Sequence, residues 1–116
     1  MKEKRLYSFE YLRYAPLEEL PEAERRLANC AAEACSKSYA PYSDFRVGAA
    51  ALLDDGEIVS AAIQESEVFP SGMCAERSLL YYVQSNRSGR KVRALAIASL
   101  PASRECSPCG ACRQVI

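Results

Sequence analysis

The sequence predicts a three-layer α/β sandwich, in which helices cover both faces of one small sheet. Two observations lead to this fold class. First, patterns typical of a helix, a hairpin, a second helix, a strand and a third helix follow one another along the chain. Second, the 116 residues suit a single domain over 1–116, which at this size buries roughly two thirds of the unfolded surface around one core.

The first helix is predicted over residues 21–37, PEAERRLANCAAEACSK. Pro21 suits the first turn of a helix, and the APYS that follows the segment ends it. One face of this helix is apolar and consists of Ala23, Leu27, Cys30, Ala31 and Ala34. This periodicity of about 3.6 residues is the signal of a helix that buries one side.

A hairpin is predicted next, because the apolar runs FRVGAAALL (45–53) and EIVSAAI (57–63) flank the turn signal DDG. The segment CAERSLLYYVQSN (74–86) has the composition of a helix. VRALAIASL (92–100) is a short continuous apolar run, which is typical of a buried strand. Finally, PCGACRQVI (108–116) contains proline at its start and predicts the first turns of another helix.

Composition limits the kinds of partner. Lysine plus arginine and aspartate plus glutamate both total 15, so the formal net charge is zero. No global field favours nucleic acid or an anionic membrane, and we expect a small or uncharged partner. No run of about 18 apolar residues occurs, and the N-terminal MKEKRLYSFEYLRY lacks the apolar stretch of a signal peptide. We therefore expect a cytoplasmic protein with neither a membrane nor a nucleic-acid partner.

The cysteines favour metal binding or a nucleophilic role over disulfide bonds. Six cysteines in 116 residues fall below the roughly 8–10% of short secreted disulfide scaffolds, and a reducing compartment would keep them as thiols. Metal binding or nucleophilic roles therefore outrank disulfides. Cys30 and Cys35, on the first predicted helix, are the exceptions, and we expect them to be packing residues.

Three of the cysteines have a spacing that suits one metal ion. Cys109 and Cys112 are three residues apart on a predicted helix, so their side chains share a face. Cys74 begins another predicted helix, where a lowered thiol pKa favours the metal-binding thiolate. Three ligands with an open fourth position are typical of catalytic zinc, and four ligands of structural zinc. Glu76 can reach that open position without being a ligand, as a general base must.

The chain resembles the cytidine deaminase family in three stretches, in family order over roughly residues 42–116: YSDFRVGAAALL, ESEVFPSGMCAER and SPCGACRQVI. The resemblance implies a cytidine-deaminase-like α/β/α sandwich with a mixed sheet. It also implies one zinc ion per subunit, bound by Cys74, Cys109 and Cys112, with Glu76 as the proton shuttle. A cysteine in place of histidine as the first ligand points to the small, homotetrameric nucleoside deaminases.

The activity implied by the resemblance is hydrolytic deamination of cytidine or deoxycytidine at C4, a reaction of pyrimidine salvage that releases ammonia. Phe45 would pack near the pyrimidine, and Glu65 would hold a sugar hydroxyl. Arg77 would lie against the thiolates and offset the net negative charge that three of them leave on a dication.

Cys106 leaves two alternatives open. The stretch CSPCGAC also matches the start of a bacterial iron–sulfur run, but the fourth cysteine of such a run is replaced by Ile116. The second alternative is a closed structural zinc site in a catalytically defective domain, with Cys106 as the fourth sulfur. Cys106 precedes Pro108 and is therefore expected in the loop ahead of the last helix.

Two features depart from the family pattern. The ribose-binding Asn-x-Glu-Asn of the family stands here as IQES, with Ile63 and Ser66 at the asparagine positions. Another aminopyrimidine nucleoside, such as blasticidin S, is therefore an alternative substrate. Family members also continue past the PCxxC helix into two further strands and a segment that helps close a neighbouring subunit's site. The resemblance thus implies a C-terminally incomplete domain, which is either a fragment or a natively short chain.

Overall fold

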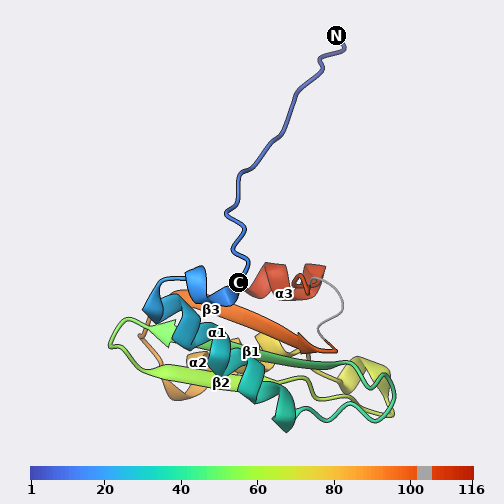
Figure 1. Cartoon of the computed structure of the whole chain (residues 1–116). Helices are drawn as coiled ribbons and strands as arrows, with labels where there is room; N and C mark the ends of the chain where they lie inside the picture. Colours follow the sequence, from blue (N-terminus) through green and yellow to red (C-terminus); the bar gives the residue numbers. More distant parts are fainter. Residues whose placement is uncertain (102–105) are drawn as a thin grey trace.

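The computed structural model describes residues 1–101 and 106–116, and Figure 1 shows its elements in the predicted order. The helices are α1 (Glu22–Ala34), α2 (Ala75–Asn86) and α3 (Gly110–Val115), and the strands are β1 (Arg46–Leu53), β2 (Ile58–Ala62) and β3 (Val92–Leu100). Short 3-10 helices occur at Leu17–Glu19, Cys35–Lys37 and Phe69–Ser71. Among the described residues, no helix has both the length and the apolar character needed to cross a membrane.

The strands form one sheet in the order β2-β1-β3, and β1 is antiparallel to both of its neighbours. The predicted hairpin is confirmed, because Gly48 of β1 pairs with Ala62 of β2 and Leu52 pairs with Ile58. In the turn between the two strands Gly56 has a φ of 90°, a conformation that glycine adopts without steric cost. The parallel part of the expected mixed sheet has no counterpart among the described strands.

Strand β1 separates two apolar cores, because successive side chains of a strand point to opposite faces. On one face, β1 packs against α2 in a cluster of buried residues: Val47, Ala49, Ala51, Leu53, Ala75, Leu79 and Val83. On the other face, Ala50 packs with Leu27 and Ala31 of α1. The helices α1 and α2 thus cover opposite faces of the sheet (Figure 1), which confirms the predicted three-layer arrangement.

Gly48 allows α1 to approach the sheet closely. A Cβ atom at this position would overlap the Ala31 carbonyl oxygen and stand 2.7 Å from the Cys35 backbone nitrogen. Cys35 is completely buried at this contact, and its Sγ lies 3.5 Å from the Ala98 carbonyl oxygen of β3. Cys30 is half-buried against the same core. Both cysteines are therefore packing residues, as expected.

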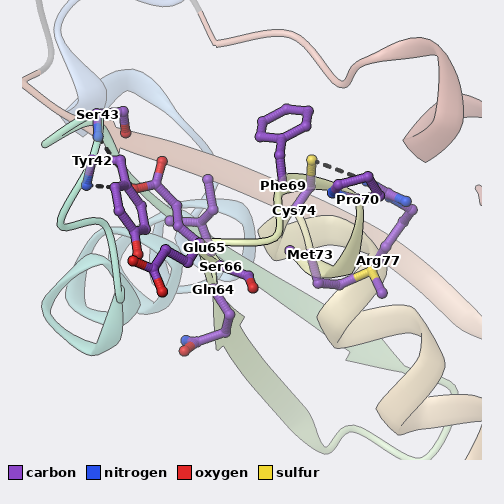
Figure 2. A pocket seen from close by; sticks show the side chains of 13 residues that line it. Tyr42, Ser43, Gln64, Glu65, Ser66, Phe69, Pro70, Met73, Cys74 and Arg77 are labelled. Carbon is purple, nitrogen blue, oxygen red and sulfur yellow. Dashed lines mark hydrogen bonds between the residues drawn. The ribbon is translucent and has the colours of Figure 1, made fainter.

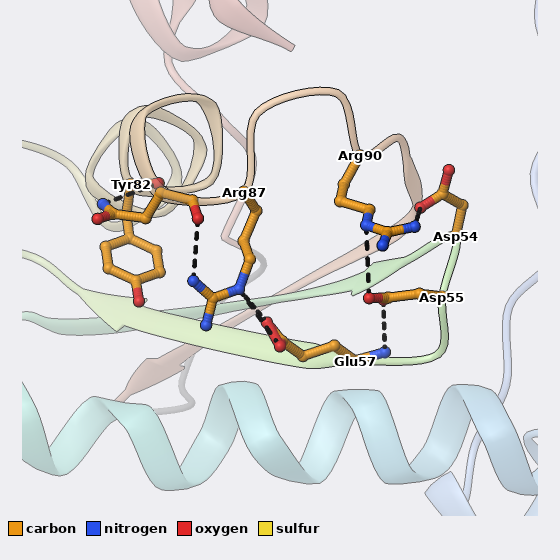
Figure 3. Close-up of polar contacts among 7 residues, drawn as sticks. Asp54, Asp55, Glu57, Tyr82, Arg87 and Arg90 are labelled. Carbon is orange, nitrogen blue, oxygen red and sulfur yellow. Dashed lines mark hydrogen bonds and ion pairs between the residues drawn. The ribbon is translucent and has the colours of Figure 1, made fainter.

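Ion pairs join the far end of α2 to the β1–β2 turn (Figure 3). Arg87 Nε donates to Glu57 Oε1 at 2.6 Å, and the guanidinium lies 5.8 Å from the centre of the Tyr82 ring. Arg90 Nε lies 3.5 Å from Asp55 Oδ2. Partly exposed pairs of this kind contribute about 0–1 kcal/mol each, so they orient α2 more than they stabilise the fold.

Candidate functional site

Three cysteine sulfurs meet where α2 and α3 begin. Cys74 is the residue before α2, Cys109 is the residue before α3, and Cys112 lies in the first turn of α3. The Sγ atoms of Cys74 and Cys109 are 3.9 Å apart, and those of Cys109 and Cys112 are 3.4 Å apart. All three sulfurs lie within 4.8 Å of one another. The structure therefore brings together the three cysteines that were predicted to share one ion.

The separations between the sulfurs fit tetrahedral zinc. Two thiolates bound tetrahedrally at a Zn–S distance of ~2.3 Å stand about 3.8 Å apart. The observed distances of 3.4 and 3.9 Å bracket that value, and thiolate donors are typical of zinc sites. Three protein ligands leave one corner of the tetrahedron for another group, which is the arrangement of a catalytic site.

Two of these thiols differ in how readily they lose a proton. Hydrogen bonding from the Cys112 backbone N–H, which lies 3.5 Å from the Cys109 sulfur, lowers the pKa of the Cys109 thiol. Burial raises the pKa of the Cys112 thiol to about 12. Cys109 is thus the readier source of a thiolate, whereas Cys112 must release a proton when it binds a metal ion.

Glu76 lies beside the sulfurs in the first turn of α2. The residue is only 4% exposed, and its Oε2 atom is 3.7 Å from the Cys112 sulfur. Its carboxylate does not belong to the group of donor atoms that lie within 4.8 Å of one another. A carboxylate next to a metal centre but outside its donor set has the position that a general base requires.

Arg77 also contacts the cluster. The Nη2 atom of Arg77 donates to Cys74 Sγ at 3.4 Å. Hydrogen bonds to the sulfurs of Cys74 and Cys112 raise the pKa of Arg77 above its ordinary range. The guanidinium therefore remains charged and opposes the negative charge of the thiolates. Its Nε atom is buried without a hydrogen-bond partner among the described residues.

A cavity of about 630 Å³ opens beside the cluster (Figure 2). Its wall consists of Tyr42 and Ser43, the segment 63–67, residues of the loop 69–73, and Cys74 with Arg77. Figure 2 shows the Cys74 sulfur at this wall, joined to Arg77 by a hydrogen bond. Because Cys74 belongs both to the wall and to the sulfur cluster, a molecule in the cavity lies next to the candidate metal site.

Backbone hydrogen bonds make the cavity wall an extension of the sheet. Directly after β2, Gln64 and Met73 exchange N–H···O bonds of 2.9 and 2.7 Å. On the other side of this segment, the Glu65 N–H donates to the Tyr39 carbonyl oxygen at 2.8 Å. The segment that follows β2 is therefore held by two isolated bridges, an antiparallel one between Gln64 and Met73 and a parallel one between Gln64 and Tyr39.

Glu65, predicted to bind the substrate, is fixed at the cavity wall. Its Oε1 atom accepts hydrogen bonds from the backbone N–H groups of Tyr42 and Ser43 at 3.1 and 3.2 Å. The Ser43 side chain and these N–H groups lower the pKa of the Glu65 carboxyl. Phe45, the other predicted contact, is instead half-buried against the core between the sheet and α2, and it does not line the cavity. Its contact with a pyrimidine stays a prediction.

Both residues at the altered family positions line the cavity. Ile63 is half-buried, and its backbone N–H donates to the Val47 carbonyl oxygen at 2.9 Å. The Ser66 hydroxyl lies 2.6 Å from the Ser71 hydroxyl and accepts from the Val68 N–H at 3.1 Å. Ile63 thus presents an apolar side chain to the cavity, whereas Ser66 serves the local loop structure.

Cys106 lies outside the sulfur cluster. It is half-buried and packs against the core between the sheet and α2. Among the described residues, the sulfurs within 4.8 Å of one another belong to Cys74, Cys109 and Cys112, and Cys106 is not one of them. This arrangement favours an open site with three cysteines over a closed site with four.

Sequence reasoning did not single out Tyr42, Phe69 or Met73 as cavity residues. Each lies within one of the stretches that carried the family resemblance, and this position in the sequence was the signal that could have identified them as site residues. Side-chain periodicity could not identify them, because Tyr42 lies in a turn, Phe69 in a short 3-10 helix and Met73 in an isolated bridge with Gln64, and none of these is a long periodic element.

Comparisons with known proteins agree with this geometry. Residues 21–116 match the family model for the cytidine and deoxycytidylate deaminase zinc-binding region. A curated cytidine deaminase of Halalkalibacterium halodurans is 41% identical over 86 residues, which cover 74% of this chain and 64% of that protein. One from Mycobacterium tuberculosis is 39% identical over 87 residues, with coverage of 74% and 63%. The chain thus spans just under two thirds of the length of these curated relatives.

Solved structures show the same fold. The crystal structure of the Mycobacterium tuberculosis cytidine deaminase superposes with a TM-score of 0.72 at 38% identity, covering 79% of this chain and 73% of that one. The cytidine deaminase from Burkholderia pseudomallei gives a TM-score of 0.70 at 35% identity, with coverage of 78% and 71%. The zinc named by the family model agrees with the donor set found here. With its zinc-type cysteine cluster and a family match over most of its length, the chain belongs to the cytidine and deoxycytidylate deaminase family.

Proposed function

We propose that the protein is a zinc-dependent hydrolase that converts cytidine and deoxycytidine to uridine and deoxyuridine and releases ammonia. One observation carries this proposal: the buried Glu76 carboxylate lies 3.7 Å from a sulfur of the three-cysteine cluster. The cluster adjoins a cavity of about 630 Å³ through Cys74, which is within the range of small-molecule sites. Three sulfur donors, a buried carboxylate and a cavity therefore lie together, which supports the proposal.

In this proposal Cys74, Cys109 and Cys112 hold the ion, and Arg77 balances the charge of the thiolates. When bound, zinc supplies Lewis-acid activation of the attacking water. Glu76 accepts one proton from that water as the C4–O bond forms and delivers it to N3. It then accepts the second proton from the new C4 hydroxyl and delivers it to the departing nitrogen as the C4–N4 bond breaks. One proton of the water thus ends on N3 and the other on ammonia, and C4 becomes a carbonyl.

The charges at the cavity favour a nucleoside over its monophosphate, although the family description names both kinds of substrate. The charged residues among the described wall are Glu65, Glu67 and Arg77, and Arg77 is already bonded to the Cys74 sulfur. A phosphate dianion would meet two carboxylates and no uncommitted cation of this wall. Repulsion of this kind is worth about 1–2 kcal/mol at short range, and about 1.4 kcal/mol corresponds to a tenfold loss of affinity.

The test is ammonia release from cytidine, deoxycytidine and deoxycytidine monophosphate, with zinc per chain measured on the same sample. We expect turnover of both nucleosides at about one zinc per chain and a kcat/KM for the monophosphate at least ~10-fold lower. A zinc-loaded protein that releases ammonia from none of the three substrates would refute the proposal. Faster turnover of the monophosphate would refute only the choice of substrate.

We further propose that the protein is cytoplasmic, acts in pyrimidine salvage and assembles as a homotetramer. The composition supports the first point, since six cysteines at low density suit a reducing compartment. The resemblance to small nucleoside deaminases with three cysteine ligands supports the other two. Sedimentation equilibrium of the purified chain tests the tetramer.

A further inference from the structure

Residues 1–16, the N-terminal arm, contain neither helix nor strand and extend away from the body of the protein (Figure 1). Their apolar side chains are unusually exposed: 93% for Leu6, 92% for Tyr7, 78% for Phe9, 70% for Tyr11 and 80% for Leu12. Soluble proteins rarely display a contiguous group of large apolar side chains, and such groups mark interaction surfaces. The arm therefore has the exposed apolar surface that is typical of a segment that binds another molecule.

The arm combines an aromatic stripe with positive charge. Tyr7, Phe9 and Tyr11 are spaced two residues apart, which places their side chains on one side of an extended chain. The rings of Phe9 and Tyr11 lie 6.3 Å apart between centres, as neighbours on one side do. The arm has four basic residues, Lys2, Lys4, Arg5 and Arg13, against two acidic ones, Glu3 and Glu10, and thus a net charge of +2.

The rim of the cavity has the complementary character. The rim is defined here as the cavity residues Tyr42, Glu65, Glu67 and Phe69, together with the exposed Val68 that lies between Glu67 and Phe69 in the chain. Its apolar side chains are exposed: 60% for Tyr42, 66% for Val68 and 89% for Phe69. Its two carboxylates, those of Glu65 and Glu67, give it negative charge. One chain therefore displays two exposed apolar surfaces of opposite charge, a combination that favours binding between copies.

We propose that the arm of one copy docks on the cavity rim of a second copy. The aromatic stripe packs against Phe69 and Tyr42, and the basic residues of the arm face Glu67. A second copy is the occupant because the arm leaves its own body in an extended course (Figure 1) and because the two surfaces match in charge. An anionic nucleic acid or lipid surface is less suited, since the arm itself includes Glu3 and Glu10 and the whole chain has no net charge.

Docking of this kind would make the neighbouring copy part of the cavity wall. Burying three aromatic side chains supplies most of the association energy, because such residues bury about 150–250 Å² each. The charges select the orientation and the partner surface. The inference does not rest on the proposed reaction, since it concerns association alone.

A charge exchange in the full chain tests the docking. The arm variant is Lys4→Glu with Arg5→Glu, and the rim variant is Glu67→Lys. We expect the unmodified chain to self-associate in sedimentation velocity, and each variant alone to associate at least ~10-fold more weakly. An equimolar mixture of the two variants should recover the association, because opposite charges face each other again. A monomeric unmodified chain, or a mixture no stronger than its parts, would overturn the proposal.

Photo-crosslinking identifies the surface that receives the arm. With p-benzoylphenylalanine in place of Phe9, in a mixture of isotopically light and heavy chains, we expect cross-linked peptides that join the arm of one copy to the segment 65–69 of another. The same photoreactive residue in place of Ser8, on the opposite side of the extended arm, is the matched control and should give much less of this product. Cross-links confined to a single copy, or to a surface other than the rim, would overturn the proposal.

Discussion

The Oε2 atom of Glu76 lies 3.7 Å from the Sγ atom of Cys112, although 36 positions separate the two residues in the sequence. The contact forms because the first turns of α2 and α3 meet, with Cys74 and Cys109 as the residues that precede them. Burial of a carboxylate beside sulfur donors is unfavourable unless a cation balances the charge. A metal ion bound by the three sulfurs would supply such a cation, and Arg77, bonded to the Cys74 sulfur, adds a second positive charge at the cluster.

Glu76→Gln should retain zinc and lose activity. The change preserves the size of the side chain but removes the proton acceptor, so kcat should fall by at least the ~10²–10⁴-fold that general acid–base catalysis contributes. Deamination kinetics and zinc analysis on the same sample measure both effects. Undiminished turnover at full zinc occupancy would show that Glu76 is not the proton carrier.

Cys112→Ser and Cys106→Ser should differ in their effect on zinc. Cys112 is buried within the sulfur cluster, so its replacement removes one of three donors and should leave well under one zinc per chain. Cys106 packs outside the cluster, so its replacement should leave the zinc content unchanged. Mass spectrometry of metals after dialysis against a chelator makes the comparison. Loss of zinc from the Cys106 variant would instead favour the closed site with four cysteines.

Gly48→Ala should destabilise the fold. The added methyl group would overlap the Ala31 carbonyl oxygen of α1, and backbone cannot move aside as a flexible side chain does. Overpacking of this kind costs about 1–3 kcal/mol, and we expect the upper part of that range. The free energy of unfolding from urea titration measures it. Gly110→Ala is the control, because nothing lies within 4 Å of a Cβ at Gly110, and its unfolding free energy should change little.

In the Glu65→Gln variant, the free energy of unfolding should depend less steeply on pH in the acid range. In the folded protein the pKa of Glu65 lies below its ordinary value of 4.5. The chief cause is hydrogen bonding from the Ser43 side chain, and hydrogen bonds from the backbone N–H groups of Ser43 and Tyr42 add to it. The stability contributed by Glu65 is therefore present above that ordinary value and is lost as the pH falls through the lower folded pKa.

Unfolding free energies measured between pH 6 and about pH 3 should thus fall less steeply for Glu65→Gln than for the unmodified chain. Glu67→Gln is the matched control. It removes a carboxylate two residues away and leaves intact the hydrogen bonds that Glu65 accepts from the Tyr42 and Ser43 N–H groups. Parallel curves for Glu65→Gln and the unmodified chain would contradict the assignment of these hydrogen bonds.

Most of the fold could be predicted because its signals are local. The apolar periodicity of α1 and the DDG turn between β1 and β2 depend on neighbouring residues alone. The zinc-type cluster could be predicted because the spacing of Cys109 and Cys112 and the position of Cys74 before a helix are themselves local. The cavity wall could not, because its shape depends on long-range pairing, such as that of Gln64 with Met73 and of Glu65 with Tyr39.

Ile63 is the residue whose substitution should most change substrate binding without touching the zinc chemistry. Its side chain lines the cavity two residues before Glu65, and its backbone is fixed by a hydrogen bond to Val47, so a polar replacement can reach the cavity without moving the wall. If Glu65 holds a sugar hydroxyl, as the family resemblance implies, the isoleucine side chain adds no second hydrogen bond to the sugar. A missing bond of this kind costs about 0.5–1.5 kcal/mol.

Ile63→Asn should therefore lower the KM for cytidine more than it raises kcat, because sugar contacts act on the ground state and the transition state alike. Ser66→Asn is the matched comparison at the second altered position. It should help less, since the Ser66 hydroxyl already bonds to Ser71 and to the Val68 N–H within the loop. Ile63 has two explanations: the cavity binds cytidine with one sugar contact missing, or it is built for another aminopyrimidine nucleoside. Steady-state kinetics with cytidine, deoxycytidine and blasticidin S distinguish them. An unchanged KM for cytidine in the Ile63 variant, with better turnover of blasticidin S by the unmodified chain, would mean that the cavity is built for a different sugar.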